Sequence, residues 1–141
     1  MSISRYNSEG YYDPTAYEAL TNIEKEEQAL RAFRPLVYIC SPFSGDVEGN
    51  VKAAQRYSRF AVDIGFIPLA PHLLFPQFLN DNVLAERQLG LFFGDVLMSK
   101  CAEVWVFGKV ISIGMEAEIK RAKWKNYRLR YFNEKCEELT I

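Results

Sequence analysis

Four short apolar runs, rich in residues that favour β-strands, alternate along the chain with segments of helical periodicity. The runs are LVYIC (36–40), FIPLA (66–70), EVWVFG (103–108) and YRLRYF (127–132). The helix-like segments between them cover residues 51–65, 83–101 and 112–125. Strands and helices that alternate through short connections form a parallel sheet covered by helices on both faces. We therefore expect an α/β fold, a Rossmann-like or flavodoxin-like three-layer arrangement with a small parallel sheet of four to five strands. Pro68 places the second run at an edge or an irregular position of that sheet.

The N-terminal part of the chain has a different pattern. Residues 14–33 are charged and carry apolar side chains at helical spacing, and Pro35 ends the segment. We therefore expect a helical arm over residues 1–34 and an α/β domain over residues 35–141. The last nine residues, 133–141, show no pattern that assigns them to an element.

Composition excludes several classes of protein. The net charge of −1 gives no overall field that would favour nucleic acid or a membrane surface. Three widely spaced cysteines without a CxxC motif indicate a reducing, cytoplasmic setting. His72 is the single histidine, so we expect neither a zinc site nor another metal or cofactor site. The first residues lack the apolar core of a signal peptide, and no apolar stretch is long enough to span a bilayer.

Ligands of parallel α/β sheets bind beyond the carboxyl ends of the strands. The loop after the first strand offers Ser41, Ser44 and Gly45, whose hydroxyls and N–H groups suit a phosphate. This loop matches neither the Walker motif nor GxGxxG. Asn50 could hold a sugar hydroxyl, although a helix cap is the commoner role for an asparagine here.

The third helix should begin near Ser112, which is a good N-cap residue type. Ser112 and Gly114 would expose backbone N–H groups at the positive end of the helix dipole, where an anion can bind. Gly114 would also let a ligand approach the backbone closely. A plain cap and turn is the commoner explanation of such a pair.

Two carboxylates lie on this helix, Glu116 and Glu118. At about 100° per residue the apolar stripe consists of Met115, Ile119 and Ala122. Glu116 then lies on a flank with lysines, as a solvated member of charge pairs. Glu118 lies on the other flank, beside the small Ala122. Because cations also lie on that flank, Glu118 could be an ordinary surface charge. The helical wheel favours Glu118 over Glu116 as a reacting carboxylate only slightly.

Asp95 lies in an apolar stretch, LGLFFGDVLMSKC. An acid in such surroundings costs free energy unless it is paired or lies in a cleft. A desolvated Asp95 would hold a proton near neutral pH and could donate it, whereas an Asp95 on the exposed sector would be an ordinary surface charge. Gly90 and Gly94 indicate that another backbone packs closely against this helix, and ordinary helix packing is sufficient to explain them.

Three segments in this order resemble the nucleoside 2-deoxyribosyltransferase family, which includes the related 5′-nucleotide N-glycosidases. They are VYICSPFSG, Asp95 eight residues before EVWVFG, and S-x-G-x-x-x-E-x-x-x-A from Ser112 to Ala122. The resemblance covers residues 36 to 132 and leaves out the arm. It implies that Glu118 is the nucleophile, that Asp95 assists the departing base and that Tyr38 positions the nucleophile.

The resemblance also bears on the substrate. Members that act on free nucleosides tend to carry an aspartate where this chain has Ser112, and members that hydrolyse nucleotides carry a serine that binds the 5′-phosphate. In this resemblance Ser112 favours a phosphorylated substrate. His72 resembles a residue on the base side of the site. Phe43 or Phe75 could stack on the base, as their loop positions allow.

The implied reaction is cleavage or transfer at the N-glycosidic bond of a (deoxy)nucleoside or its 5′-monophosphate, through a glycosyl ester on Glu118. In retaining glycosidases the two carboxyls lie about 5–5.5 Å apart, one ionised and one protonated. The expected partners are a small-molecule nucleoside or nucleotide, with no nucleic acid and no membrane. We also expect a homodimer or higher homo-oligomer, because helix 83–101 has more apolar surface than one sheet face can cover.

Two other functions remain open. The chain could be a nucleotide-binding sensor or interaction module without turnover, with the arm as its partner surface, because a fold does not settle a function. It could also be a protein whose carboxylates are all structural. The base, the sugar, and the choice between hydrolysis and transfer are not decided by the sequence.

Overall fold

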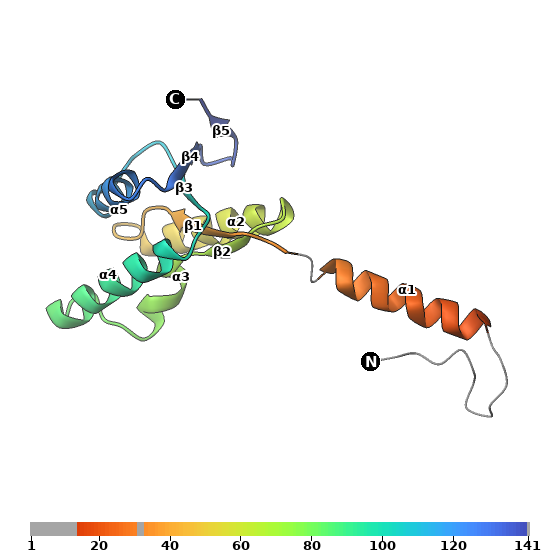
Figure 1. Ribbon diagram of the computed structural model, residues 1–141. Coiled ribbons are helices and arrows are strands. Elements are labelled where there is room, and N and C mark those ends of the chain that lie inside the picture. Colours follow the sequence, from red (N-terminus) through yellow and green to blue (C-terminus); the bar gives the residue numbers. More distant parts are fainter. Residues whose placement is uncertain (1–13, 31–32, 141) are drawn as a thin grey trace. The chain divides into compact units, whose positions relative to one another are not determined.

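The computed structural model describes residues 14–30 and 33–140. The chain divides into two units, one up to Phe33 and the other from Arg34 onward. In the first unit the structure describes helix α1, Pro14–Leu30 (Figure 1). The remaining residues of the expected arm, 1–13 and 31–32, lie outside the described residues.

The second unit is built on a five-stranded sheet in the order β2-β1-β3-β4-β5. Its strands are β1 (Leu36–Cys40), β2 (Ile67–Leu69), β3 (Glu103–Phe107), β4 (Arg128–Phe132) and β5 (Glu138–Leu139). The first four are parallel, with Tyr38 paired to Leu69 on β2 and to Val104 on β3. The expected α/β class is confirmed, and β2 lies at the edge, as Pro68 indicated. β5 runs antiparallel to β4, so the sheet is mixed.

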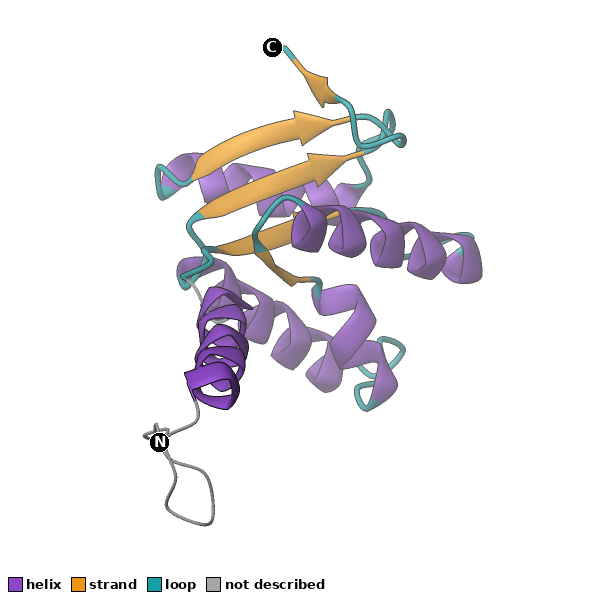
Figure 2. Cartoon of the chain, turned by 90° about the vertical axis from the view of Figure 1, so that its right-hand side faces the viewer, coloured by secondary structure: helices purple, strands orange, loops and turns teal. Residues whose placement is uncertain are grey.

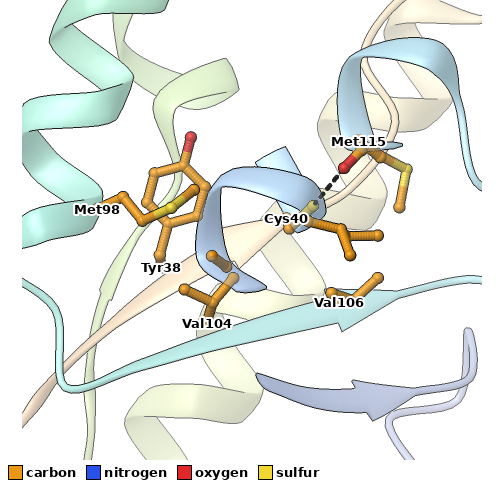
Figure 3. Packing of buried hydrophobic residues seen from close by; sticks show 8 residues of the cluster. Tyr38, Cys40, Met98, Val104, Val106 and Met115 are labelled. Carbon is orange, nitrogen blue, oxygen red and sulfur yellow. Dashed lines mark hydrogen bonds between the residues drawn. The ribbon is translucent and has the colours of Figure 1, made fainter. Parts of the chain in front are cut away.

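Helices cover both faces of this sheet, which gives three layers (Figure 2). Because successive strand residues point to opposite faces, β1 serves two cores. On one face Val37 and Ile39 pack with residues of α2 (Val47–Asp63). On the other face Tyr38 and Cys40 pack with residues of α4 (Leu84–Ser99) and α5 (Ile113–Trp124), as Figure 3 shows.

The first connection is shorter than the sequence suggested. α2 begins at Val47, because the Asp46 side chain accepts a hydrogen bond of 3.1 Å from the backbone N–H of Gly49 and caps the helix. The expectation that Asn50 is the cap was therefore wrong. Asn50 lies in the first turn, where its amide donates to the carbonyls of Phe43 and Ser44 at 3.0 and 3.1 Å and fixes the loop after β1.

The expected loop 70–82 also contains helical turns. They are α3, Pro71–Leu74, and a 3₁₀ turn, η1, Phe75–Gln77. Pro71 and Pro76 lie in the first positions of these turns, where a missing N–H breaks no helical hydrogen bond. A single residue, Ala70, separates α3 from β2, so α3 carries His72 at the carboxyl end of the sheet.

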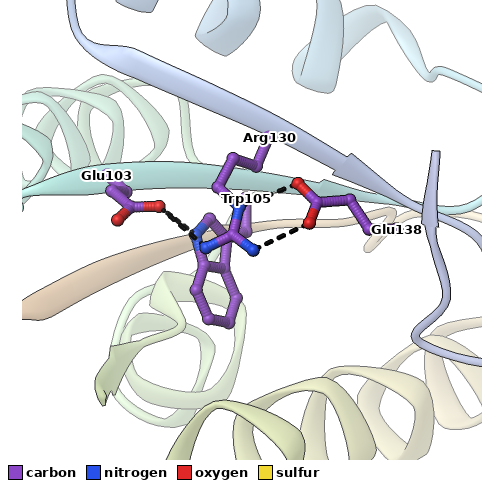
Figure 4. Close-up of polar contacts among 4 residues, drawn as sticks. All are labelled: Glu103, Trp105, Arg130 and Glu138. Carbon is purple, nitrogen blue, oxygen red and sulfur yellow. Dashed lines mark hydrogen bonds and ion pairs between the residues drawn. The ribbon is translucent and has the colours of Figure 1, made fainter. Parts of the chain in front are cut away.

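One arginine joins the last three strands (Figure 4). Arg130 on β4 donates to Glu103 on β3 at 3.2 Å and, through two nitrogens, to Glu138 on β5 at 2.9 and 2.8 Å. Its guanidinium also lies 5.1 Å from the centre of the Trp105 ring. These contacts fix the two-residue β5, which is too short to be stable by strand pairing alone.

Candidate functional site

The candidate site is a group of side chains around Glu118 at the carboxyl ends of β1 and β2. Tyr38 and Cys40, both buried, project from β1 to the same side of the sheet (Figure 3). α4 approaches closely at Gly94, where a Cβ atom would lie 3.3 Å from the Tyr38 hydroxyl. The absence of a side chain at Gly94 therefore leaves the room that this hydroxyl occupies.

Glu118 projects from the second turn of α5, and its side chain is 17% exposed. Burial raises the pKa of its carboxyl from 4.5 to about 7. Hydrogen bonding with Tyr38 and Cys40 lowers this pKa, and the charge of Asp95 adds to the rise. Glu116, by contrast, is exposed to solvent. Of the two carboxylates, it is Glu118 that lies within the fold.

Glu118 also affects the pKa values of the two hydrogen-bond donors on β1, Tyr38 and Cys40. The pKa of the Tyr38 hydroxyl and that of the Cys40 thiol are both raised, first by burial and then by the charge of Glu118. Both groups therefore keep their protons at neutral pH and act as hydrogen-bond donors. Cys40 was not predicted as a site residue, although the two-residue period of a strand places it on the same face as Tyr38.

His72 lies beside the carboxyl of Glu118, with 4.0 Å between its Nε2 and Oε1 of Glu118. The imidazole stacks on the Phe43 ring, with centroids 5.1 Å apart and an interplanar angle of 16°. Burial lowers the pKa of His72, whereas the charge of Asp81 and a hydrogen bond with the Ser41 backbone raise it. The Ser41 hydroxyl is buried, and it is the one buried side-chain oxygen without a partner among the described residues.

Asp95 interacts with this group through its charge, which acts on both Glu118 and Tyr38. Its carboxylate also forms an ion pair of 2.7 Å with Arg121, and both side chains are partly exposed. Arg121 follows Glu118 by three residues on α5, so the two lie on neighbouring positions of one helix face. The sequence did not assign this partner to Asp95, because it depends on how α4 and α5 pack.

The other candidate residues lie around this group. Ser112 caps α5 as expected, and its Oγ accepts a hydrogen bond of 3.2 Å from the N–H of Met115. Gly114 has open space where a Cβ would be, so the backbone there is accessible. Ser44 and Gly45 lie in the exposed part of the loop after β1, and Gly45 has a φ of +95°. Within the described residues, no hydrogen bond or ion pair joins Ser44 or Gly45 to Glu118.

A separate hollow of about 420 Å³ lies next to the group, lined by Phe43, residues 76–81 and Glu86. The hollow shares two residues with the surroundings of His72: Phe43, which stacks on the imidazole, and Asp81, whose charge acts on it. Phe75 packs on Phe78 and Phe93 instead. Among the described residues, no three histidine, cysteine or acidic side chains gather as metal ligands. Within the same residues, no helix has both the length and the apolar content needed to cross a bilayer.

Comparisons with known proteins agree with this architecture. The model of the family described as Domain of unknown function (DUF7768) matches residues 35–132, so the chain belongs to that family. A search of curated proteins found no match. Among solved structures, the chain is similar to a 2-deoxyribosyltransferase from the psychrotolerant bacterium Bacillus psychrosaccharolyticus, with a TM-score of 0.60 and 13% identity over 70% of this chain and 72% of the other. At this identity the likeness shows a shared fold.

Proposed function

We propose that this member of the DUF7768 family cleaves or transfers at the N-glycosidic bond of a (deoxy)nucleoside or nucleoside 5′-monophosphate. The observation that carries the proposal is the buried carboxyl of Glu118, with Tyr38, His72 and Asp95 around it. A carboxyl whose pKa is moved to about 7 between hydrogen-bond donors is typical of a reacting group. The fold shared with a 2-deoxyribosyltransferase supports the same chemistry.

In the proposed reaction an oxygen of ionised Glu118 forms a bond to C1′ while the bond from C1′ to the base nitrogen breaks. Its electron pair stays on the base, which takes a proton from Asp95. Water or a second base then attacks C1′, releases Glu118 and retains the configuration. Tyr38 holds the nucleophile in position. Because a carboxylate in an ion pair has no proton to give, the pair between Asp95 and Arg121 must open, and Asp95 must take a proton from water, before the base departs.

The remaining candidates are assigned to the substrate. Ser112 and Gly114, at the start of α5, suit the 5′-phosphate, since a helix N-terminus attracts anions. Ser41, Ser44 and Gly45 contribute hydroxyl and N–H groups near the sugar, with Asn50 holding their loop in shape. Residues 35–141 form the catalytic domain in this proposal and residues 1–34 an appended arm, with a cytoplasmic location.

The test is the release of free base from a panel of deoxynucleosides and their 5′-monophosphates, followed by chromatography. We expect turnover by the wild type and by Glu116→Gln, whose carboxyl is exposed, and a loss of about a thousandfold or more in Glu118→Gln. Mass spectrometry of protein quenched during turnover should detect the glycosyl ester in the wild type and not in Glu118→Gln. Undiminished turnover by Glu118→Gln would refute the assignment of the nucleophile.

A nucleotide-binding module without turnover is the second candidate. The ion pair of Asp95 with Arg121 favours it, because this pair leaves the proposed acid without a proton in the resting state. Calorimetry separates the two functions: a module binds a nucleotide and forms no product.

We also propose that the chain forms a homodimer through α4. In the single chain only Gly94 and Met98 of this helix are buried. Leu84, Leu91 and Phe92 expose 60 to 70% of their surface, which is more apolar area than a solvated helix carries without a partner.

A further inference from the structure

His72 has surroundings that a contact with the base alone does not explain. Its Nε2 is turned toward Oε1 of Glu118 at 4.0 Å. The Phe43 ring stacks on one side of the imidazole at 5.1 Å and limits its rotation. The ring also hydrogen-bonds with the Ser41 backbone. A nucleophile, a base within reach of it and a third group that orients the base together form the usual arrangement of an activated nucleophile.

We propose that His72 is the proton acceptor that ionises Glu118 for its attack on the sugar. This inference rests on the proposed function and changes the role of His72 from a contact with the base to a group that acts on the nucleophile. In this proposal the neutral ring carries its proton on Nδ1, so that the lone pair of Nε2 faces Glu118. The gap of 4.0 Å closes by a small movement of either side chain or is bridged by one water molecule.

The step balances with one proton that Asp95 takes from water when its ion pair with Arg121 opens. The proton of the Glu118 carboxyl moves to Nε2 of His72, and the freed carboxylate oxygen forms the bond to C1′. The C1′–N bond breaks toward the base, which is protonated by Asp95. When water later attacks C1′, its proton goes to Asp95, the Glu118 carboxylate leaves, and His72 returns the first proton to it.

The charged groups around the pair favour this exchange. Tyr38 and Cys40 on β1 and Asp95 on α4 face Glu118, whose pKa is about 7. Asp81 faces His72, whose pKa is lowered from 6.5 by burial. Just below pH 7 the proton therefore lies mainly on Glu118, and the lone pair of Nε2 of His72 is free to accept it. Above pH 7 Glu118 is ionised without help, so His72 contributes on the acidic side.

The first test uses the fact that His72 is the single histidine of the chain, so one pair of imidazole ¹⁵N signals reports it in the full-length protein. We expect the Nδ1–H tautomer in the neutral ring. In the wild type the imidazole signals should also report the ionisation of Glu118 near pH 7, and Glu118→Gln should remove that step and so shift the titration midpoint of His72. Glu116→Gln should leave the midpoint unchanged. An Nε2–H tautomer, or a midpoint that ignores Glu118→Gln, would overturn the proposal.

The second test compares the pH dependence of kcat/KM for the wild type and His72→Gln. At pH 8.5 the two should agree within about threefold, and at pH 6 the variant should be lower by up to about tenfold, because about a tenth of a carboxyl with a pKa of about 7 is ionised there. A loss of equal size at every pH would show that His72 only contacts the base. If the wild type releases no base from any nucleotide, the proposed function fails, and the NMR measurement still decides whether His72 and Glu118 exchange a proton.

Discussion

Replacing Glu118 by glutamine should change how the stability of the protein depends on pH. Burial raises the pKa of Glu118 from 4.5 to about 7 in the folded protein. Between these two values the folded state binds more protons than the unfolded state, so stability falls as pH rises through this window. Below pH 4.5 the carboxyl is protonated in both states, and above pH 7 it is ionised in both. The full loss of stability that comes from burying the ionised carboxyl is therefore reached on the alkaline side.

The size of the effect follows from the shift. A change from 4.5 to about 7 is about 2.5 pKa units, each worth about 1.4 kcal/mol, which gives about 3 kcal/mol at pH 8. The Glu118 side chain is 17% exposed, so solvent screening reduces this figure little. The amount is a large part of the 5–15 kcal/mol by which a domain of roughly this size is stable.

This pH dependence of stability is measured by urea unfolding of the wild type, Glu118→Gln and Glu116→Gln at pH 4.5 and pH 8. Between the two pH values the wild type should lose about 3 kcal/mol more than Glu118→Gln, with m-values unchanged. Glu116→Gln should follow the wild type, because Glu116 is exposed. Parallel pH dependences for the wild type and Glu118→Gln would mean that the carboxyl is not desolvated in solution, and the reasoning about the site would fall with it.

Two further predictions concern α4. Gly94→Ala should lower kcat about tenfold or more, because the new Cβ would lie 3.3 Å from the Tyr38 hydroxyl and displace it. The control is Gly90→Ala on the same helix, whose Cβ would make an ordinary contact of 3.5 Å with Leu79 and should leave kcat unchanged. Steady-state kinetics compare the two variants. Phe92→Asp should convert the proposed dimer to a monomer in size-exclusion chromatography with light scattering, and a wild type that is already a monomer at micromolar concentration would contradict the interface.

The sheet was predictable because its strands are short, apolar and separated by helical patterns. The start of α2 and the strand β5 were not predicted, and each has a local cause. Asp46 was assigned to a loop because its capping bond to Gly49 depends on the turn geometry, so the start of α2 was placed four residues too late. β5 has two residues and is held by Arg130 rather than by a strand pattern, so no periodicity marks it.

The site was less predictable, because it is formed by packing between distant segments. The helical wheel placed Glu116 and Glu118 on opposite flanks of the apolar stripe but did not say which flank meets β1. The wheel favoured Glu118 only slightly, and the resemblance to a known family decided for it. The ion pair between Asp95 and Arg121 joins two helices whose relative positions no local pattern gives.

The way the charges are distributed argues against a purely structural role for Glu118. A structural carboxylate inside a fold is normally paired with a cation, which removes most of its cost. The nearest suitable cation on α5, Arg121, pairs instead with the more exposed Asp95. Glu118 is left with two neutral donors and an imidazole whose pKa is lowered, so its burial costs stability above pH 7. A glutamine of the same shape would remove that cost without loss of packing, and a position that gains stability by losing its charge is typical of a reacting group rather than of a structural one.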